Sequence, residues 1–506
     1  MTNTLWTIDE VKEDTVPHAS APKATIPEAP GNIELPTEAR RALFEQFRER
    51  VVHNAALDRT LVSFQANKGI PFYGWFKYRE GFSEALVGYL LRELHPEPGV
   101  LLDPFVGSGS TLFAGRSLGW ETHGIEVLPV GIYAMQARML ADHVNVGRFR
   151  EAIDGLANVN FAEHVNGEYA FHHIPITRGA FPFDQEVELL GYIAYCHQMI
   201  VDEDVRGLML YAAFCILEDI SFTRKDGQYL RWDARSGRSQ GKKPFNKGRI
   251  LDFREAITCK LRQMAADLGL QPIQQALFPS DVGKSELPDV HLHEGSCLTL
   301  LPTMPAGSID FVLTSPPYAN RYDYTRTYAL ELVYLGCGAE KVKNLRQAML
   351  SCTVENRDKR AQLEAYYTSI GRPQDFDTVD RTFSDQAALQ EVLGILDAAR
   401  ERGELNNENI ARLVRNYFYE MCFVVFELAR LLRPGGIVAM VNDNVRYHGE
   451  EVPVDLVLSD FAESFGLSTR HIWTLGRGKG NSSQQMGNHG RTELRKCVYV
   501  WEKLRV

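Results

Sequence analysis

A serine, two prolines and a tyrosine stand in a row at Ser315, Pro316, Pro317 and Tyr318. The segment Ile309–Leu313, which is apolar except for Asp310, predicts a strand before them, and two prolines after a strand hold the backbone extended. The Ser315 hydroxyl and the Pro316 carbonyl could then accept hydrogen bonds from an –NH2 group, while the ring of Tyr318 offers a stacking surface for a base. The segment therefore predicts chemistry on an exocyclic amine through positioning and electrostatics. Taken alone, it could also be a strand-to-loop corner with a packed tyrosine.

A glycine-containing segment with the sequence DPFVGSGST follows another predicted strand. Glycines let the backbone approach a ligand closely, and a loop between a strand and a helix start gathers backbone N–H groups. Leu112 stands where a dinucleotide loop has its third glycine. The loop opens on Asp103, which would repel a pyrophosphate and suits a cationic sulfonium amino acid. The candidate cofactor-binding residues of this loop are Asp103, Pro104, Phe105, Gly107, Ser108, Gly109, Ser110 and Thr111.

Three more candidate cofactor-binding residues follow neighbouring predicted strands. Glu126 lies 23 residues after Asp103, and an acid at about that spacing can bind the two hydroxyls of a ribose. A helix cap or a surface acid is the alternative for this position. Ser296 and Cys297 follow the strand predicted over Val290–His293 and would lie beside an adenine, although Cys297 could equally be a packing residue.

These loops need a scaffold that brings several strand ends together. The strand Val100–Asp103, a helix over Ser110–Leu118 and the strand Glu121–Ile125 form a β-loop-α-β unit, which is typical of the opening of a doubly wound sheet. The strand pattern is lost after about Asn145 and again over 338–412, where helical patterns replace it. We therefore predict an α/β fold, a Rossmann-like doubly wound sheet interrupted by two largely helical insertions.

Composition places limits on the class of protein. The chain has 506 residues and a net charge of −10, which argues against wholesale coating of nucleic acid but leaves room for a local basic face. Its eight cysteines are dispersed without zinc-ligand spacing, so we expect reduced thiols and no metal site. No apolar stretch approaches the ~20 residues of a membrane span, and the N-terminus lacks a signal-peptide pattern. These features predict a soluble, cytoplasmic protein that is not membrane-bound.

DPFVGSGST together with TSPPY resembles the DNA amino-methyltransferases, which make N4-methylcytosine or N6-methyladenine, many of them in restriction–modification systems. Trp75–Tyr78 with Phe82 and Ser83 is similar to that family's motif ahead of the cofactor loop, and Leu432–Asn444 to a later core strand. The resemblance implies S-adenosylmethionine as cofactor, with Phe82 and Ser83 over its methionine part. It also implies that Ser315, Pro316, Pro317 and Tyr318 act on a flipped base of double-stranded DNA, and a separately encoded restriction endonuclease is a candidate partner.

The prediction of which base is methylated depends on fewer residues. In this family a serine at the position of Ser315 favours the N4 amine of cytosine, whereas Asp or Asn favours the N6 amine of adenine. The cofactor loop precedes the catalytic loop here, unlike the permuted order frequent among cytosine-N4 enzymes, so adenine remains an alternative. The chain has no Pro-Cys dipeptide for C5-cytosine chemistry. An RNA N-methyltransferase and a catalytically inactive DNA-binding subunit also stay open as hypotheses.

Contacts to DNA are predicted mainly in the segment 224–249, which has nine Lys and Arg against two Asp and includes aromatic residues. Basic side chains neutralise phosphates and aromatic rings stack on displaced bases. A solvated loop is the alternative, and the Gly/Ser/Gln-rich loop 476–491 is a second candidate. The predicted DNA-binding residues are Arg224, Lys225, Arg231, Trp232, Arg235, Lys242 and Lys243.

The predicted organisation follows from these assignments. It comprises a disordered or extended tail (1–40), a cofactor-binding half of the core (41–150), an insertion predicted to recognise DNA (151–289), a catalytic half (290–337), a helical insertion (338–412) and the C-terminal core strands (413–506).

Overall fold

An eight-stranded sheet organises the chain. The computed structural model describes residues 37–79, 81–226, 229–238, 244–277, 287–475 and 494–505. The strands are β1 (Val51–His53), β2 (Val100–Asp103), β3 (Glu121–Glu126), β6 (Val290–Glu294), β7 (Ile309–Thr314), β8 (Leu432–Asp443), β11 (Leu467–Thr474) and β12 (Lys496–Lys503). Their order is β1-β11-β12-β8-β7-β2-β3-β6, and β12 runs antiparallel to both of its neighbours while the other pairs are parallel.

The chain leaves β2 toward β3 and β6 and then returns to β7 on the other side of β2, so the strand order reverses between β2 and β7. Ligands of doubly wound sheets bind outside the carboxyl ends of the strands at such a reversal. The predicted Rossmann-like α/β fold is confirmed.

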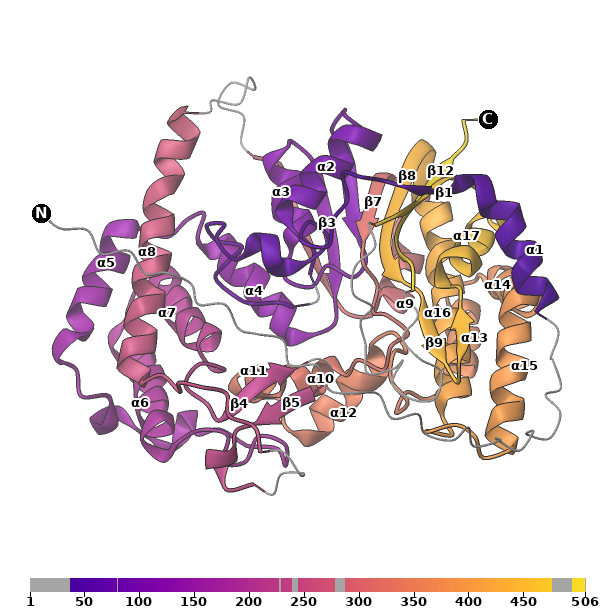
Figure 1. The fold of residues 1–506 in the computed structure, drawn as a ribbon. Coiled ribbons are helices and arrows are strands. Elements are labelled where there is room, and N and C mark those ends of the chain that lie inside the picture. The colour runs from indigo at the N-terminus through magenta and orange to yellow at the C-terminus, as the bar shows by residue number, and fades with distance from the viewer. Residues whose placement is uncertain are drawn as a thin grey trace, which may run out of the picture. The chain divides into compact units, whose positions relative to one another are not determined.

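Helices cover both faces of the sheet, as Figure 1 shows. Side chains alternate between two cores along each strand: Leu101 and Leu313 pack with α2 (Glu84–Leu94) and α3 (Ser110–Ser117), whereas Leu102 and Val312 face the core that contains α16 (Ile410–Leu431) and α17 (Val454–Ser464). Burial on both faces explains why the central strands read as continuous apolar runs in the sequence.

The first insertion forms a core of its own. Its elements are α4 (Pro129–Leu140) at the junction, then α5 (Val146–Gly155), α6 (Phe183–Met199), α7 (Glu203–Cys215), the hairpin β4 (Thr223–Asp226) and β5 (Tyr229–Trp232), and α8 (Phe253–Leu277). The basic segment thus begins as an antiparallel hairpin rather than a loop. The predicted tail 1–40 lies outside the described residues except for its last four, where α1 (Glu38–Phe47) already begins.

Three of the four helices of the second insertion pack in the helical layer of the sheet, whereas Val342 on the first of the four packs in the core of the first insertion. Its helices are α12 (Ala339–Ala348), α13 (Arg360–Ser369), α14 (Pro373–Asp385) and α15 (Ala387–Glu401). Leu363, Phe376 and Leu389 pack in the same core as α16 and α17. This insertion therefore extends the body of the fold.

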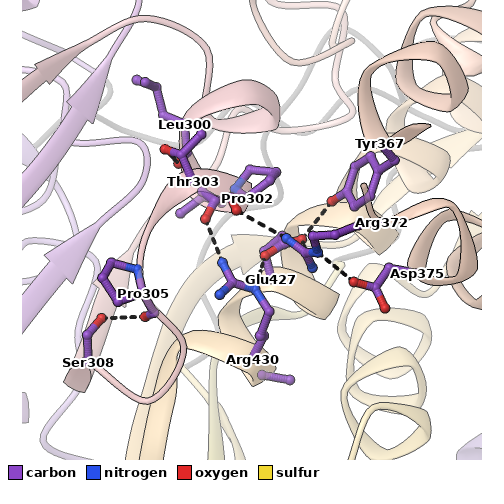
Figure 2. A network of polar contacts seen from close by, with 12 residues as sticks. Leu300, Pro302, Thr303, Pro305, Ser308, Tyr367, Arg372, Asp375, Glu427 and Arg430 are labelled. Carbon is purple, nitrogen blue, oxygen red and sulfur yellow. Dashed lines mark hydrogen bonds and ion pairs between the residues drawn. The ribbon is translucent and has the colours of Figure 1, made fainter. Parts of the chain in front are cut away.

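Buried Glu427 on α16 fixes the second insertion to the segment before β7, as Figure 2 shows. Its Oε1 accepts hydrogen bonds from Tyr367 Oη at 2.8 Å and Arg372 Nη2 at 2.7 Å, and its Oε2 accepts one from Arg430 Nε at 2.5 Å. Arg372 Nη1 also donates to the carbonyl of Pro302 at 3.1 Å. Glu427 thus joins α13, α16 and the start of α14, and Arg372 links this group to the turn that leads into β7.

The eight cysteines are free thiols, as predicted, and seven of them are at least partly buried. Among the described residues, no helix has both the length and the apolar composition needed to cross a membrane.

Candidate active site

A cavity of about 770 Å³, counted with the solvent at its mouth, opens at the carboxyl ends of β2, β3, β6 and β7. Ligand pockets commonly fall in this size range. The sequence-predicted residues that line it are Phe82, Asp103, Pro104, Phe105, Gly107, Ser108, Ser110, Thr111, Glu126, Ser296, Cys297, Ser315 and Pro317. The two predicted loops, which are about 200 residues apart in the chain, therefore border one cavity.

Asp103 joins the two loops through hydrogen bonds. Its Oδ2 accepts from Thr111 Oγ1 at 2.7 Å, and its Oδ1 accepts from Thr314 Oγ1 at 2.6 Å and from the Phe105 N–H at 3.0 Å. The residue is 2% exposed, and this burial raises the pKa of its carboxyl to about 6. Because Thr314 directly precedes Ser315, the Asp103 carboxylate sets the position of the SPPY loop (Ser315–Tyr318) relative to the glycine loop.

Glu126 forms the second acidic point of the cavity. Its Oε2 accepts from the Gly107 N–H at 2.8 Å, and its Oε1 accepts from the N–H groups of Val127 and Leu128 at 2.9 and 2.8 Å. The side chain is 9% exposed, and burial raises the pKa of its carboxyl to about 7. Gly107 has a φ of 58°, and a Cβ there would lie 2.9 Å from the Tyr78 ring, so glycine is required where the loop turns.

Four predicted site residues do not line the cavity. Gly109, with a φ of 89°, precedes α3, and Pro316 and Tyr318 lie in the catalytic loop beside the lining residues. Ser315 Oγ donates to Tyr318 Oη at 3.4 Å. The prediction for Ser83 is wrong: this residue is fully buried at the N-cap of α2, where its Oγ accepts from the Leu86 N–H at 3.1 Å.

The sequence reasoning missed one wall of the cavity. Tyr324, Ala348, Met349 and Leu350 line it from α10 (Tyr324–Thr327) and from the end of α12 and the segment after it. These residues follow no motif. The tyrosines just after the SPPY loop are a signal that could have found Tyr324, and no local signal marks Ala348, Met349 or Leu350.

The motif ahead of the glycine loop reaches the cavity through Tyr78. Its ring stacks on that of Tyr328 with centroids 5.1 Å apart and planes inclined by 10°. Lys225 Nζ lies 4.7 Å from the Tyr328 centroid on the hairpin side. The aromatic motif therefore connects the cavity to the basic hairpin.

The surroundings of Lys225 contradict its predicted contact with DNA. Its side chain is 4% exposed and forms an ion pair with Glu331 of α11 (Ala329–Tyr334), whose side chain is 1% exposed. In the alternating hairpin, Thr223 and Lys225 point inward while Arg224 points outward. An ammonium buried against a carboxylate is not available to a phosphate, so Lys225 does not belong to the DNA-binding set.

The remaining predicted basic residues differ in their surroundings. Arg235 binds the buried carboxylate of Asp233 through two nitrogens at 2.8 and 3.0 Å, which fixes the turn after β5. The Arg238 guanidinium lies 3.6 Å from the ring centroid of Trp232 and covers that ring. Arg224 is exposed and Arg231 is partly exposed, whereas Lys242, Lys243 and the loop 476–491 lie outside the described residues.

Comparison with known proteins identifies the family. No protein-family model matches the chain. The type II methyltransferase M.AvaI of Nostoc sp. (strain PCC 7120) is 42% identical over 465 residues, covering 92% of this chain and 93% of that protein. M.BsoBI of Geobacillus stearothermophilus is 38% identical over 520 residues, covering 99% of this chain and all of that protein, and M.MvaI of Kocuria varians is 21% identical over 430 residues. The chain therefore belongs to the type II methyltransferases of restriction–modification systems.

Proposed function

We propose that this protein transfers a methyl group from S-adenosylmethionine to the N4 amine of a cytosine within a specific double-stranded DNA sequence. One observation carries the proposal: the hydrogen bonds of Asp103 to Thr111 and Thr314 hold a glycine loop and an SPPY loop at one cavity. The family supports a DNA substrate. A separately encoded endonuclease that reads the same sequence is the partner that we propose for it.

The lining residues fit the proposed cofactor. A carboxylate has about four acceptor sites, and Asp103 and Glu126 each use three on protein donors. Glu126 would accept from the ribose hydroxyls, Asp103 would face the methionine ammonium group, and Ser296 and Cys297 would border the adenine. Bound there, S-adenosylmethionine supplies an electrophilic methyl group on a sulfonium centre.

The catalytic loop supplies fixed acceptors for the target amine. The Ser315 hydroxyl and the Pro316 carbonyl would accept the two N–H groups of the amine and direct its lone pair toward the cofactor. Tyr447 Oη donates to the carbonyl of Ala319 at 2.6 Å and thereby fixes the far side of this loop. Such prepositioned groups accelerate a displacement because they need no reorganisation during the reaction.

Cofactor affinity is expected to rise with pH between about 6 and 8. Burial raises the pKa of Asp103 to about 6 and of Glu126 to about 7, and the ionised carboxylates are the forms that attract the cofactor. Because these folded-state pKa values exceed those of the unfolded chain, the free protein should also lose unfolding free energy as pH rises from about 4 to 7. Calorimetric titration with cofactor across this range, with Glu126→Gln as the comparison, measures the effect. A wild-type affinity that does not change with pH would contradict it.

Charge reversal on the outer face of the hairpin is expected to weaken DNA binding. Arg224→Glu with Arg231→Glu removes two candidate phosphate partners, so the slope of log K against log salt should become shallower by about one for each phosphate that is no longer neutralised. The matched control is Arg41→Glu on α1 with Arg48→Glu just after that helix, which makes the same change in net charge on exposed arginines. Fluorescence anisotropy at several salt concentrations gives the DNA affinity and its dependence on salt. Equal affinities and slopes in the two double variants would move the DNA face elsewhere.

Transfer of a radiolabelled methyl group to double-stranded DNA or to RNA tests the substrate class. We expect label on DNA and none on RNA. Label on RNA alone would favour an RNA methyltransferase, and DNA binding without any transfer would favour an inactive DNA-binding subunit.

A further inference from the structure

Three histidines and a glutamate gather on one face at the edge of the sheet. The strand β6 pairs in parallel with β3, and His123 stands opposite His291 in the register. Side chains alternate along a strand, so Glu121 and His123 of β3 share a face with His291 and His293 of β6. The opposite face of β3 is closed by α3 and the glycine loop: a Cβ at Gly124 would lie 2.8 Å from Leu112.

The distances within this cluster match those between the ligands of a metal ion. Glu121 Oε1 lies 3.4 Å from His123 Nε2 and 3.2 Å from His291 Nε2, and the three atoms all lie within 4.8 Å of one another. Bonds of about 2.0–2.2 Å to a tetrahedral ion place neighbouring ligand atoms roughly 3.3–3.5 Å apart. A charge-assisted hydrogen bond would be shorter, at about 2.7–2.9 Å. One carboxylate oxygen thus lies at these spacings from two imidazole nitrogens. The rings of His123 and His291 are stacked, with centroids 4.4 Å apart and planes inclined by 22°, so one ring must turn before both lone pairs can face one ion.

A fourth residue supports the orientation of the first histidine. His293 Nε2 lies 3.1 Å from His123 Nδ1, and the two rings are stacked with an inclination of 8°. Metal-binding histidines are typically held by a hydrogen bond at the ring nitrogen that does not bind the ion.

We propose that Glu121, His123 and His291 bind one divalent transition-metal ion of the zinc class, with a water molecule in the remaining position. The ion would join β3 to the edge strand β6, which leads directly into Gly295 and the cavity wall at Ser296 and Cys297. The site lies about 10 Å along β3 from Glu126, too far for contact with the reacting groups. Its role is structural: it holds the edge strand that carries one side of the cofactor cavity.

No local sequence pattern indicates this site, and the expectation of no metal rested on cysteine spacing alone. The four residues of the cluster come in pairs from two strands that lie about 170 residues apart in the chain, and each pair has the i, i+2 spacing of one strand face. The register of the sheet brings the pairs together.

Zinc titration of the full-length, EDTA-treated and dialysed protein tests the proposal. Calorimetry and elemental analysis should give one tightly bound zinc per chain, and Co²⁺ should give the strong visible absorption of a tetrahedral site. Glu121→Gln and His291→Gln should abolish this binding. His293→Gln should weaken it about 10–100-fold, as expected for a residue that orients a ligand. His143→Gln, at an exposed histidine outside the cluster, should bind zinc as the wild type does.

Thermal denaturation provides the second readout. Zinc should raise the melting temperature of the wild type and of His143→Gln but not of His291→Gln, because a ligand that binds only the folded state stabilises it. Circular dichroism of the zinc-free variants checks that each is folded. The proposal is overturned if the folded wild type binds no zinc, or if Glu121→Gln and His291→Gln bind it with unchanged affinity.

Discussion

Replacing Ser315 by alanine is expected to lower kcat by about 10²–10³-fold, the effect of removing one prepositioned hydrogen-bonding group from a reacting centre. The Ser315 hydroxyl borders the cavity and follows Thr314, which Asp103 holds at 2.6 Å. Alanine keeps this backbone arrangement and removes the acceptor for the target amine. Cofactor affinity should therefore change little. Single-turnover methyl transfer measures the effect on the reaction rate, and calorimetry measures the effect on cofactor affinity.

Ser308→Ala is the matched control for this variant. Ser308 lies just before the amino end of the same strand, about 20 Å along it, where its hydroxyl donates to the Pro305 carbonyl at 2.8 Å. Its loss should leave kcat unchanged. Normal turnover by Ser315→Ala would remove Ser315 from the catalytic assignment, and an equal loss of cofactor affinity would make it a cofactor ligand.

Replacing Lys225 by methionine is expected to lower the free energy of unfolding by about 3–5 kcal/mol, as when one member of a buried ion pair is removed. Methionine fills the space of the lysine stem but leaves the Glu331 carboxylate buried without its counter-ion. The change should also disturb the Tyr328 ring, on which Tyr78 of the cavity stacks. Urea unfolding followed by circular dichroism measures the loss.

Two further variants test whether the loss of stability comes from the buried ion pair. Adding Glu331→Leu to Lys225→Met should recover most of the stability, because the second substitution removes the uncompensated charge. Arg148→Met breaks an ion pair with Asp202 whose arginine is 67% exposed, and it should cost less than about 1 kcal/mol. If Lys225→Met proves as stable as the wild type but binds DNA more weakly in a salt-dependent way, Lys225 returns to the DNA-binding set.

The parts of the fold that sequence could predict are those encoded locally. The strands β2 and β7 are largely apolar because both of their faces are buried, and each ends directly at a motif whose residue types limit the chemistry. The glycine loop and the SPPY loop therefore predicted nine of the 24 residues that line the cavity.

The parts that sequence could not predict depend on contacts between distant segments. The inward direction of Lys225 follows from the register of the hairpin, and its partner Glu331 is 106 residues away. Tyr324 and Met349 enter the cavity because α10 and α12 pack beside it, which no local pattern encodes. Ser83 shows the opposite case. A serine at the start of a helix is a local signal for an N-cap, and Ser83 has this role in the structure. The family resemblance instead predicted that Ser83 contacts the cofactor.

Nucleoside mass spectrometry identifies the methylated base in DNA that has been treated with the enzyme and S-adenosylmethionine. The same measurement with the Ser315→Ala variant tests whether the SPPY loop acts on that base. We expect N4-methylcytosine in the wild-type reaction and none with Ser315→Ala. N6-methyladenine in its place would contradict the cytosine assignment while keeping amine chemistry at the SPPY loop. Methylated bases formed equally well by Ser315→Ala would contradict the catalytic role of that loop itself.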